Sequence, residues 1–133
     1  MSRLTWLEYG MELAKTASLR SEDPYVQVGC CILRPDNSIA SLGYNGAPPG
    51  VDINWSDRDD RRKRVIHAVT NALRFIKPGE GDRMFVTLMP CSDCLKNAAS
   101  YGINKIFYNK VYDFDTSAKD LAQEFRITLQ QIT

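Results

Sequence analysis

The first twenty residues alternate between apolar and charged positions with the period of an α-helix. The apolar positions are Leu7, Met11, Ala14 and Ala17. Charged side chains such as Glu8 and Glu12 lie between them, which is the pattern of a helix with one buried face. Asp23-Pro24 follows, and the residue before a proline avoids helical geometry. We therefore predict an amphipathic helix over residues 3–20.

Two short apolar runs come next, and together they predict a β-hairpin. Residues 26–33 are apolar and rich in residues that favour strands, and residues 39–43 form a second run of the same kind. Pro35-Asp36-Asn37 separates the two runs. Because these three residue types favour turns, the chain is expected to reverse there and pair the two strands.

The remainder of the chain predicts helices and strands in alternation. Residues 44–60 contain Asn-Gly and Pro-Pro-Gly and are expected to form a loop. Further helices are predicted over residues 65–76, from Pro90 to near Gly102 and over 118–122, with strands over 84–88 and 103–108. Residues 125–132 fit either a last strand or a continuation of the helix before them. This order predicts one α/β domain over residues 1–133, with a central mixed sheet flanked by helices.

Composition and charge narrow the possible partners. Seventeen basic and sixteen acidic residues leave a net charge of +1, which argues against broad electrostatic capture of nucleic acid. The charged run over residues 58–64 mixes signs, so a solvated surface is favoured there over a phosphate or RNA site. No apolar run approaches the roughly 18 residues of a membrane span. The charged N-terminal segment does not resemble a signal peptide, and we expect a cytoplasmic protein without membrane or nucleic-acid partners.

Four cysteines need an explanation in a chain that is expected to stay reduced. Cys30 and Cys31 are adjacent in a predicted strand, so their side chains point to opposite faces and suit buried apolar positions. Cys91 and Cys94 follow Pro90 with C-x-x-C spacing at a predicted helix start. The positive end of a helix favours thiolates, and thiolates are the form in which cysteine binds zinc.

The single histidine, His67, lies at the start of the preceding predicted helix. One histidine and two cysteines leave the fourth position of a tetrahedral zinc open to water, which is typical of a catalytic site. Two alternatives remain open. The C-x-x-C pair could be a redox pair, although this leaves His67 without a function, and His67 could be a hydrogen-bonded structural residue.

These residues resemble the zinc-dependent cytidine deaminases, whose signature is H-x-E followed by P-C-x-x-C. Here His67-Ala68-Val69 precedes Pro90-Cys91-Ser92-Asp93-Cys94. The further motifs resemble the dCMP deaminase family: Asp23-Pro24 before Val28-Gly29, GYNGAPPG at residues 43–50, VTLMPC at 86–91 and VYD at 111–113. The resemblance extends over roughly residues 1–115. It implies a three-layer cytidine-deaminase-like domain and hydrolytic deamination of dCMP to dUMP.

The resemblance also implies functions for particular residues. It assigns one Zn²⁺ per chain to His67, Cys91 and Cys94. The residues it implies in substrate binding are Asn45 near the sugar or phosphate, with Asn71 and Tyr112 in the same pocket. The family commonly has a basic residue for the phosphate near the end of the His helix; the closest position here is Pro78, so Arg74 or Lys77 is expected in its place. Many family members are hexamers that dCTP activates and dTTP inhibits, and the effector loop corresponds to Gly43, Tyr44, Asn45 and Gly46. A bound triphosphate would bring Mg²⁺ with it.

Val69 is the departure from this pattern, because the family keeps a catalytic glutamate there. Valine has no proton to give or take, so we expect the chain to be inactive or severely impaired while zinc binding is retained. Periodicity alone would place Val69 in the core, since Ile66, Leu73 and Ile76 share its helix face. Either a single substitution has silenced an otherwise active deaminase, or the protein naturally binds nucleotides without catalysis. The retained remainder of the site favours the first explanation.

The alternative functions are other zinc-dependent deaminases and zinc proteins without catalysis. Deaminases of free cytidine, riboflavin precursors or tRNA adenosine share the zinc signature, but residues 43–50 argue against all three. A non-catalytic nucleotide-binding or regulatory protein with a retained zinc site is the alternative outside the enzyme class. A purely structural zinc module would bind no nucleotide and would unfold when zinc is released.

Overall fold

The computed structural model describes residues 2–112 and 115–133 of the chain. The helices are α1 (Trp6–Ser18), α2 (Arg58–Arg64), α3 (Ala68–Leu73), α4 (Ser92–Ser100) and α5 (Ala118–Glu124). The strands are β1 (Gly29–Leu33), β2 (Ile39–Tyr44), β3 (Arg83–Leu88), β4 (Lys105–Lys110) and β5 (Thr128–Gln131). Within the described residues, no helix is long and apolar enough to cross a bilayer.

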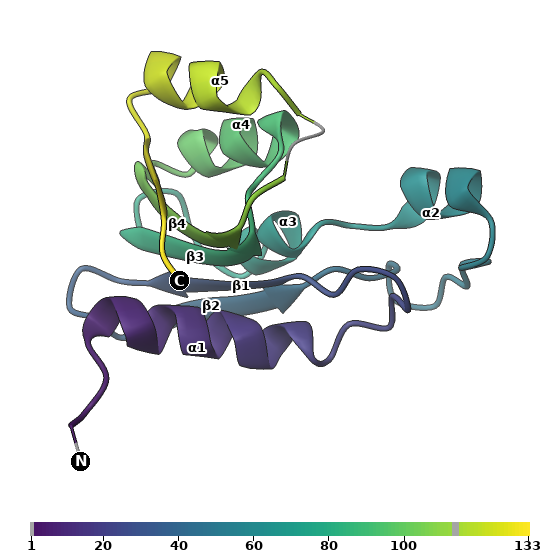
Figure 1. Ribbon diagram of the computed structural model, residues 1–133, viewed down its shortest axis with the longest axis horizontal. Coiled ribbons are helices and arrows are strands. Elements are labelled where there is room, and N and C mark those ends of the chain that lie inside the picture. Colours follow the sequence, from purple (N-terminus) through teal and green to yellow (C-terminus); the bar gives the residue numbers. More distant parts are fainter. Residues whose placement is uncertain (1, 113–114) are drawn as a thin grey trace.

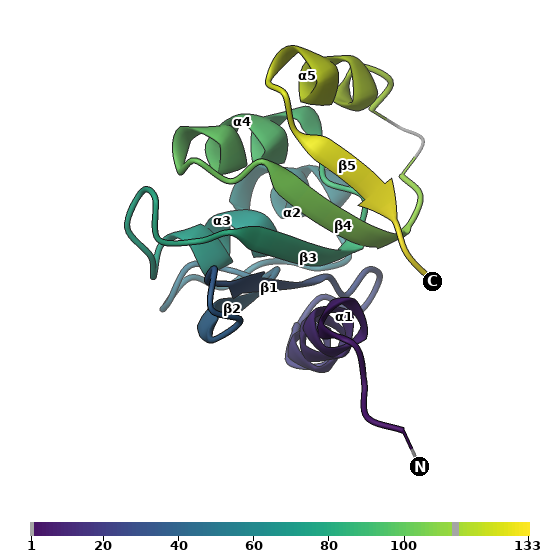
Figure 2. The same ribbon diagram turned by 90° about the vertical axis from the view of Figure 1, so that its left-hand side faces the viewer.

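The strands form one mixed sheet in the order β2-β1-β3-β4-β5. Strand β1 pairs antiparallel with both β2 and β3, while β3 with β4 and β4 with β5 are parallel. Helix α1 covers one face, and α3, α4 and α5 lie on the other (Figures 1 and 2). The predicted fold class, an α/β domain with a central mixed sheet between helices, is confirmed.

Strand β1 shows how the two faces are filled. Cys31 and Leu33 pack in the cluster beneath α1, whereas Cys30 and Ile32 belong to the larger cluster beneath α3 and α4. All four side chains are fully buried. A strand covered on both faces carries an unbroken apolar run, and the prediction that Cys30 and Cys31 are buried on opposite faces is confirmed.

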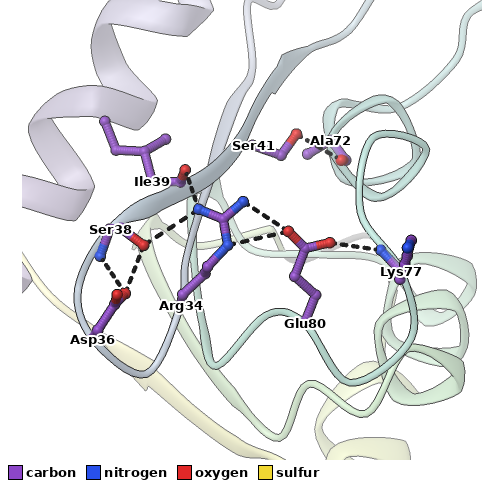
Figure 3. Close-up of polar contacts among 8 residues, drawn as sticks. All are labelled: Arg34, Asp36, Ser38, Ile39, Ser41, Ala72, Lys77 and Glu80. Atoms are coloured by element: carbon purple, nitrogen blue, oxygen red, sulfur yellow. Dashed lines mark hydrogen bonds and ion pairs between the residues drawn. The ribbon is translucent and has the colours of Figure 1, made fainter.

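Contacts at the β1–β2 turn tie this hairpin to the segment between α3 and β3 (Figure 3). Nε and Nη2 of Arg34 donate to Oε2 of Glu80 at 3.1 and 2.7 Å, and Nη1 donates to the carbonyl of Ile39 at 2.8 Å. Oε1 of Glu80 accepts from the backbone N–H of Lys77 at 2.9 Å. The end of the α3 segment is therefore fastened to the hairpin.

Helix α3 also lies directly against β2. Ser41 Oγ donates to the carbonyl of Ala72 at 2.7 Å. At Gly43, a Cβ atom would come within 2.5 Å of the backbone nitrogen of Ala72. Only glycine allows so close an approach, so Gly43 sets the depth at which α3 and its N-terminal residue His67 sit on the sheet.

Two elements differ from the predictions. Residues 44–60 were expected to be a loop, but α2 begins at Arg58, where Asp57 caps it by accepting from the N–H groups of Asp59 and Asp60 at 3.0 and 3.4 Å. The helix predicted over residues 65–76 begins only at Ala68, because Ile66 forms a two-hydrogen-bond bridge with Gly46.

The C-terminal segment had two possible structures, and it forms the strand β5. Arg126 has a φ of 58°, which an α-helix cannot contain. The helix α5 therefore ends at Glu124, and the chain turns back to pair with β4.

Candidate metal centre and its cavity

The side chains of His67, Cys91 and Cys94 meet where two helices begin. His67 is the N-cap residue of α3, Cys91 is the N-cap residue of α4, and Cys94 lies in the first turn of α4. Neither N-cap side chain bonds to its own helix. Both are therefore turned toward each other and toward Cys94, and these three residues are the candidate metal cluster found in the described part of the chain.

The distances among the three residues test whether a zinc ion fits. Nδ1 of His67 lies 3.3 Å from Sγ of Cys94 and 3.5 Å from Sγ of Cys91, and the two sulfurs are 3.4 Å apart. Ligands about 2.0 to 2.3 Å from a tetrahedral zinc lie roughly 3.5 to 3.8 Å from one another. The cluster is close to that spacing, and its sulfurs are too far apart for a disulfide of about 2.05 Å. The donor set and its geometry fit zinc.

The electrostatics of the cluster also favour a cation. The hydrogen bond between the two sulfurs lowers the pKa of Cys91 to about 4, and His67 contributes in the same direction. The same sulfur contact, together with burial, raises the pKa of Cys94. The hydrogen bond to Cys91 raises the pKa of His67. In the metal-free cluster these shifts favour the thiolate at Cys91, and zinc binding requires the other two groups to lose their protons as well.

A second layer of contacts holds the first turn of α4 in place. The carboxylate of Asp115 accepts from the backbone N–H of Ser92 at 2.7 Å and from its hydroxyl at 2.8 Å. These bonds, with further bonds from Ser117, lower the pKa of Asp115 to about 2. Sequence reasoning missed Asp115, because it lies 23 positions from Ser92 in a segment without a recognisable motif.

The cluster opens into a cavity of about 670 Å³. Apolar side chains form much of its wall: Val26, Val28, Val65, Val69, Val86, Leu88, Met89 and Val111. Asp23 is the carboxylate lining this cavity among the described residues. Its oxygens already accept from the N–H groups of Tyr25 and Val26 and from the Asn45 amide at 2.8, 3.2 and 3.4 Å. No free carboxylate among the described lining residues stands beside the three candidate ligands.

Asn45 and Tyr112 both line the cavity, as the sequence predicts. The Asn45 side chain is buried and braces the entry to β1, because its Oδ1 accepts from the N–H of Val28 at 2.8 Å and its Nδ2 donates to the carbonyl of Val26 at 2.9 Å. Tyr112 is half-buried. Asp113, which completes the VYD motif, lies outside the described residues.

Comparison with known proteins gives this centre a family. Residues 4–110 match the model of the cytidine and deoxycytidylate deaminase zinc-binding region. The chain belongs to this family. Among its relatives, the deoxycytidylate deaminase of Homo sapiens is 33% identical over 142 residues, with 96% of this chain and 80% of that protein covered. ComE operon protein 2 of Bacillus subtilis is 33% identical over 141 residues, with 99% and 74% covered.

Solved structures agree with this assignment. The dCMP deaminase of cyanophage S-TIM5, solved in complex with dCMP and dUMP, superposes with a TM-score of 0.84 at 27% identity. The match covers 99% of this chain and 100% of that one. The fold of the chain is therefore that of the cytidine deaminases, as the sequence motifs imply.

In this deaminase chain, Val69 lines the cavity beside the metal cluster and also packs in the hydrophobic core. Its side chain is 2% exposed and lines the cavity, and it belongs to the same apolar cluster as Cys30 and Val86. Nucleobase deaminases with the H-x-E signature use the glutamate of that motif as general acid and base. Here the third position of the motif presents only methyl groups to the cavity.

Asn71 and Arg74 lie outside the cavity lining, which differs from the expectation that they face the substrate. Successive helical residues are rotated by about 100°, so Asn71 projects roughly 200° away from Val69. Its Nδ2 donates to the carbonyl of Tyr44 at 2.8 Å. The Arg74 guanidinium lies over the ring of Phe75, 4.9 Å from its centroid. In the deaminase chain Asn71 therefore joins α3 to the end of β2, and Arg74 lies on the exposed surface.

The basic residues that do line the deaminase cavity are Arg58, Arg61 and Arg62 of α2. The sequence predicts a solvated surface for this run because it mixes positive and negative charges. The sequence does contain a signal for this basic face, because Arg58, Arg61 and Arg62 occupy positions i, i+3 and i+4. Residues with that spacing share one face of a helix.

Proposed function

We propose that this chain is a dCMP deaminase in which Val69 has removed the proton-transferring group. His67, Cys91 and Cys94 would hold one zinc ion, and the cavity beside them would take the pyrimidine ring. The observation that carries the proposal is that these three ligands meet in the lining of one cavity whose other lining residues are mostly apolar. The deoxycytidylate deaminases among the relatives support dCMP as the substrate.

The chemistry divides between the metal and the chain. Bound zinc would supply the activated water that attacks C4 of the ring. The chain's own part is to hold the ion, to surround the ring with apolar walls and to move protons from water to ring nitrogen and leaving amine. Val69 cannot move these protons, and loss of general acid–base catalysis typically costs about 10²- to 10⁴-fold in rate. We therefore propose retained zinc and ring binding with severely impaired turnover.

A second candidate is a non-catalytic nucleotide-binding or regulatory protein with a retained zinc site. Val69 favours it, because this side chain is packed into the core cluster with Cys30 and Val86. Both candidates require zinc and nucleotide binding. They differ only in whether restoring a carboxylate at position 69 restores turnover.

Regulation and assembly belong to the proposal as well. We propose that dCTP activates and dTTP inhibits the chain through the loop that contains Gly43, Tyr44, Asn45 and Gly46, with Mg²⁺ accompanying the triphosphate. The loop supports this by its position, since Asn45 lines the cavity while Tyr44 is exposed beside it. We also propose that the chain assembles as a homo-oligomer, in the form of a hexamer, and that it is cytoplasmic.

The deciding experiment compares this chain with its Val69→Glu form for dCMP deamination, with zinc and dCTP present. The expected result is at least a 10²- to 10⁴-fold faster reaction for the glutamate form. Val69→Gln is the matched control, because the amide has nearly the same shape but cannot exchange the protons. It should remain as slow as the parent chain.

Two outcomes would contradict the proposal in different ways. If neither the parent nor Val69→Glu turns over dCMP while zinc is bound stoichiometrically, dCMP deamination fails and the nucleotide-binding candidate takes its place. If the parent already turns over as fast as Val69→Glu, the assigned importance of position 69 is wrong although the family activity stands.

A further inference from the structure

We propose that Arg58 and Arg62 of α2 form the phosphate-binding site of the cavity and so select nucleoside monophosphates over nucleosides. This inference rests on the proposed function and adds the residues that set its substrate class. It replaces Arg74 and Lys77, which lie outside the cavity lining, as the source of positive charge.

The first step is the placement of the two guanidinium groups. Arg58 and Arg62 are four positions apart on α2, so they share one face of the helix. That face lines the same cavity as His67 and Cys91. A nucleotide whose ring lies beside the metal cluster extends through its sugar to a phosphate, and the α2 side of the cavity is where the positive charge is.

The second step is the anchoring of α2, a seven-residue helix without buried side chains. Arg61 supplies the anchor from the same face. Its Nη1 donates to the carbonyl of Trp55 at 2.6 Å, and its guanidinium lies over the ring of Tyr25, 4.2 Å from the centroid. The first contact joins α2 to the loop before it, and the Tyr25 contact joins it to the segment before β1. Arg58 and Arg62 are therefore presented to the cavity from a helix that Arg61 ties to that segment.

The third step is that neither guanidinium group has a competing partner in the part of the chain that the structure describes. Arg64 on the same helix forms an ion pair with Asp60. Within residues 2–112 and 115–133, by contrast, the side chains of Arg58 and Arg62 make no ion pair and no hydrogen bond. Asp23, the carboxylate on the described lining, is occupied by backbone and amide donors. The positive charge of the pair is thus available to an anion that enters the cavity.

The chemistry of the side chain completes the argument. A guanidinium presents paired N–H donors that match two phosphate oxygens, and it stays charged at all physiological pH values. Both residues are exposed at the surface, so their conformations can adjust to the phosphate. A nucleoside without a phosphate would gain nothing from either residue.

The test measures binding rather than turnover, by titration calorimetry on the zinc-loaded chain with dCMP and with deoxycytidine. The variants are Arg58→Gln, Arg62→Gln and the double variant. Hydrogen bonds to charged groups change affinity by roughly tenfold to a hundredfold, so each single variant should weaken dCMP binding by about tenfold or more. Deoxycytidine binding should not change in any variant.

Lys63→Gln and Arg64→Gln are the matched controls, because each removes one positive charge from α2 at a position outside the cavity lining. Both should bind dCMP like the parent. Thermal unfolding of every variant checks that α2 and the zinc site remain in place. Weakening by the controls equal to that by Arg58→Gln would reduce the effect to general charge and overturn the assigned site.

The remaining outcomes separate this inference from the proposed function. Equal affinity of the parent for dCMP and deoxycytidine would overturn the phosphate site and leave recognition of the ring standing. Unchanged dCMP binding by the double variant would also overturn it. If the zinc-loaded parent bound neither ligand, the proposed function itself would fail, and the phosphate site would fail with it.

Discussion

Around the β1–β2 turn, Arg34 donates to a carboxylate, a hydroxyl and a carbonyl of its own chain (Figure 3). Helix α2 lies at the opposite end of the molecule from that turn (Figure 1). The side chains of its residues Arg58 and Arg62 line a cavity and have no polar partner in the described chain. The same side chain therefore stabilises the fold in one region and remains available to a ligand in the other. What separates the two uses is whether a partner from the protein is already in place.

The cysteines divide between two regions in the same way. Burial in the sheet raises the pKa of Cys31 to about 12 and also raises that of Cys30, so both stay neutral thiols that pack like small apolar residues. At the start of α4, the sulfur contact lowers the pKa of Cys91 to about 4. Surroundings rather than residue type decide which thiols can bind a metal.

The largest expected effect is the loss of zinc when a cysteine of the metal cluster, rather than one of the buried pair in β1, is replaced. Cys91→Ser should lose nearly all bound zinc after dialysis against a weak chelator, because the thiolate ligand is replaced by a poorly coordinating hydroxyl. Cys31→Ala should keep about one zinc per chain, although it removes a fully buried group. Metal content measured by plasma mass spectrometry decides the matter. Stoichiometric zinc in Cys91→Ser would show that the cluster is not the metal site.

Removal of the same zinc with a strong chelator should lower the melting temperature of the parent, since the ion binds only the folded arrangement of ligands. The melting temperature of Cys91→Ser should not respond to the chelator. A response of equal size in both proteins would place the metal elsewhere in the chain.

The next effect sharpens the contrast between the arginines. Arg34→Ala should lower the free energy of unfolding measurably, because it removes the guanidinium donors to the Glu80 carboxylate and to the carbonyl of Ile39. Arg58→Ala should stay within about 0.5 kcal/mol of the parent, as expected for a surface side chain that has no polar partner among the described residues. Urea denaturation measures both. A larger loss for Arg58→Ala would mean that α2 arginines support the fold rather than a ligand.

Much of the fold could be predicted from the sequence, because the signals involved are local. The apolar stripe predicts α1, and the breaks at proline and glycine predict the ends of most strands to within a few residues. The spacing of His67 and the C-x-x-C pair indicated a metal cluster that the structure assembles. These features depend on helix and strand periodicity and on which residues can end an element.

The missed features depend on contacts between distant positions. Helix α2 has no apolar stripe to predict it, and its place beside the cavity is set by the Arg61–Tyr25 contact and by the bridge between Gly46 and Ile66. Asn71 was expected to face the cavity because it follows His67 by four residues. His67, however, lies outside the helix as its cap, so the spacing of four residues does not align the two side chains.

The smallest expected effect concerns Asp115, which holds the first turn of α4 below the metal cluster. Asp115→Ala removes the acceptor of the Ser92 N–H and should cost about 1 kcal/mol, the usual loss for a helix cap. Hydrogen bonds from Ser92 lower the pKa of this carboxyl from 3.8 to about 2. Because the folded pKa is the lower one, the stabilisation is complete above the unfolded pKa and is lost as the pH falls toward about 2.

The difference in unfolding free energy between the parent and Asp115→Ala, measured on zinc-free protein at pH 5, 4 and 3, should therefore shrink as the pH falls. Asp115→Asn is the matched control, because it keeps an acceptor oxygen and loses only the charge, and it should approach the parent at the lowest pH. If the difference stayed constant from pH 5 to pH 3, the charge on Asp115 would not be what holds α4. The first turn of that helix, with Cys91 and Cys94, would then depend on packing against the sheet alone.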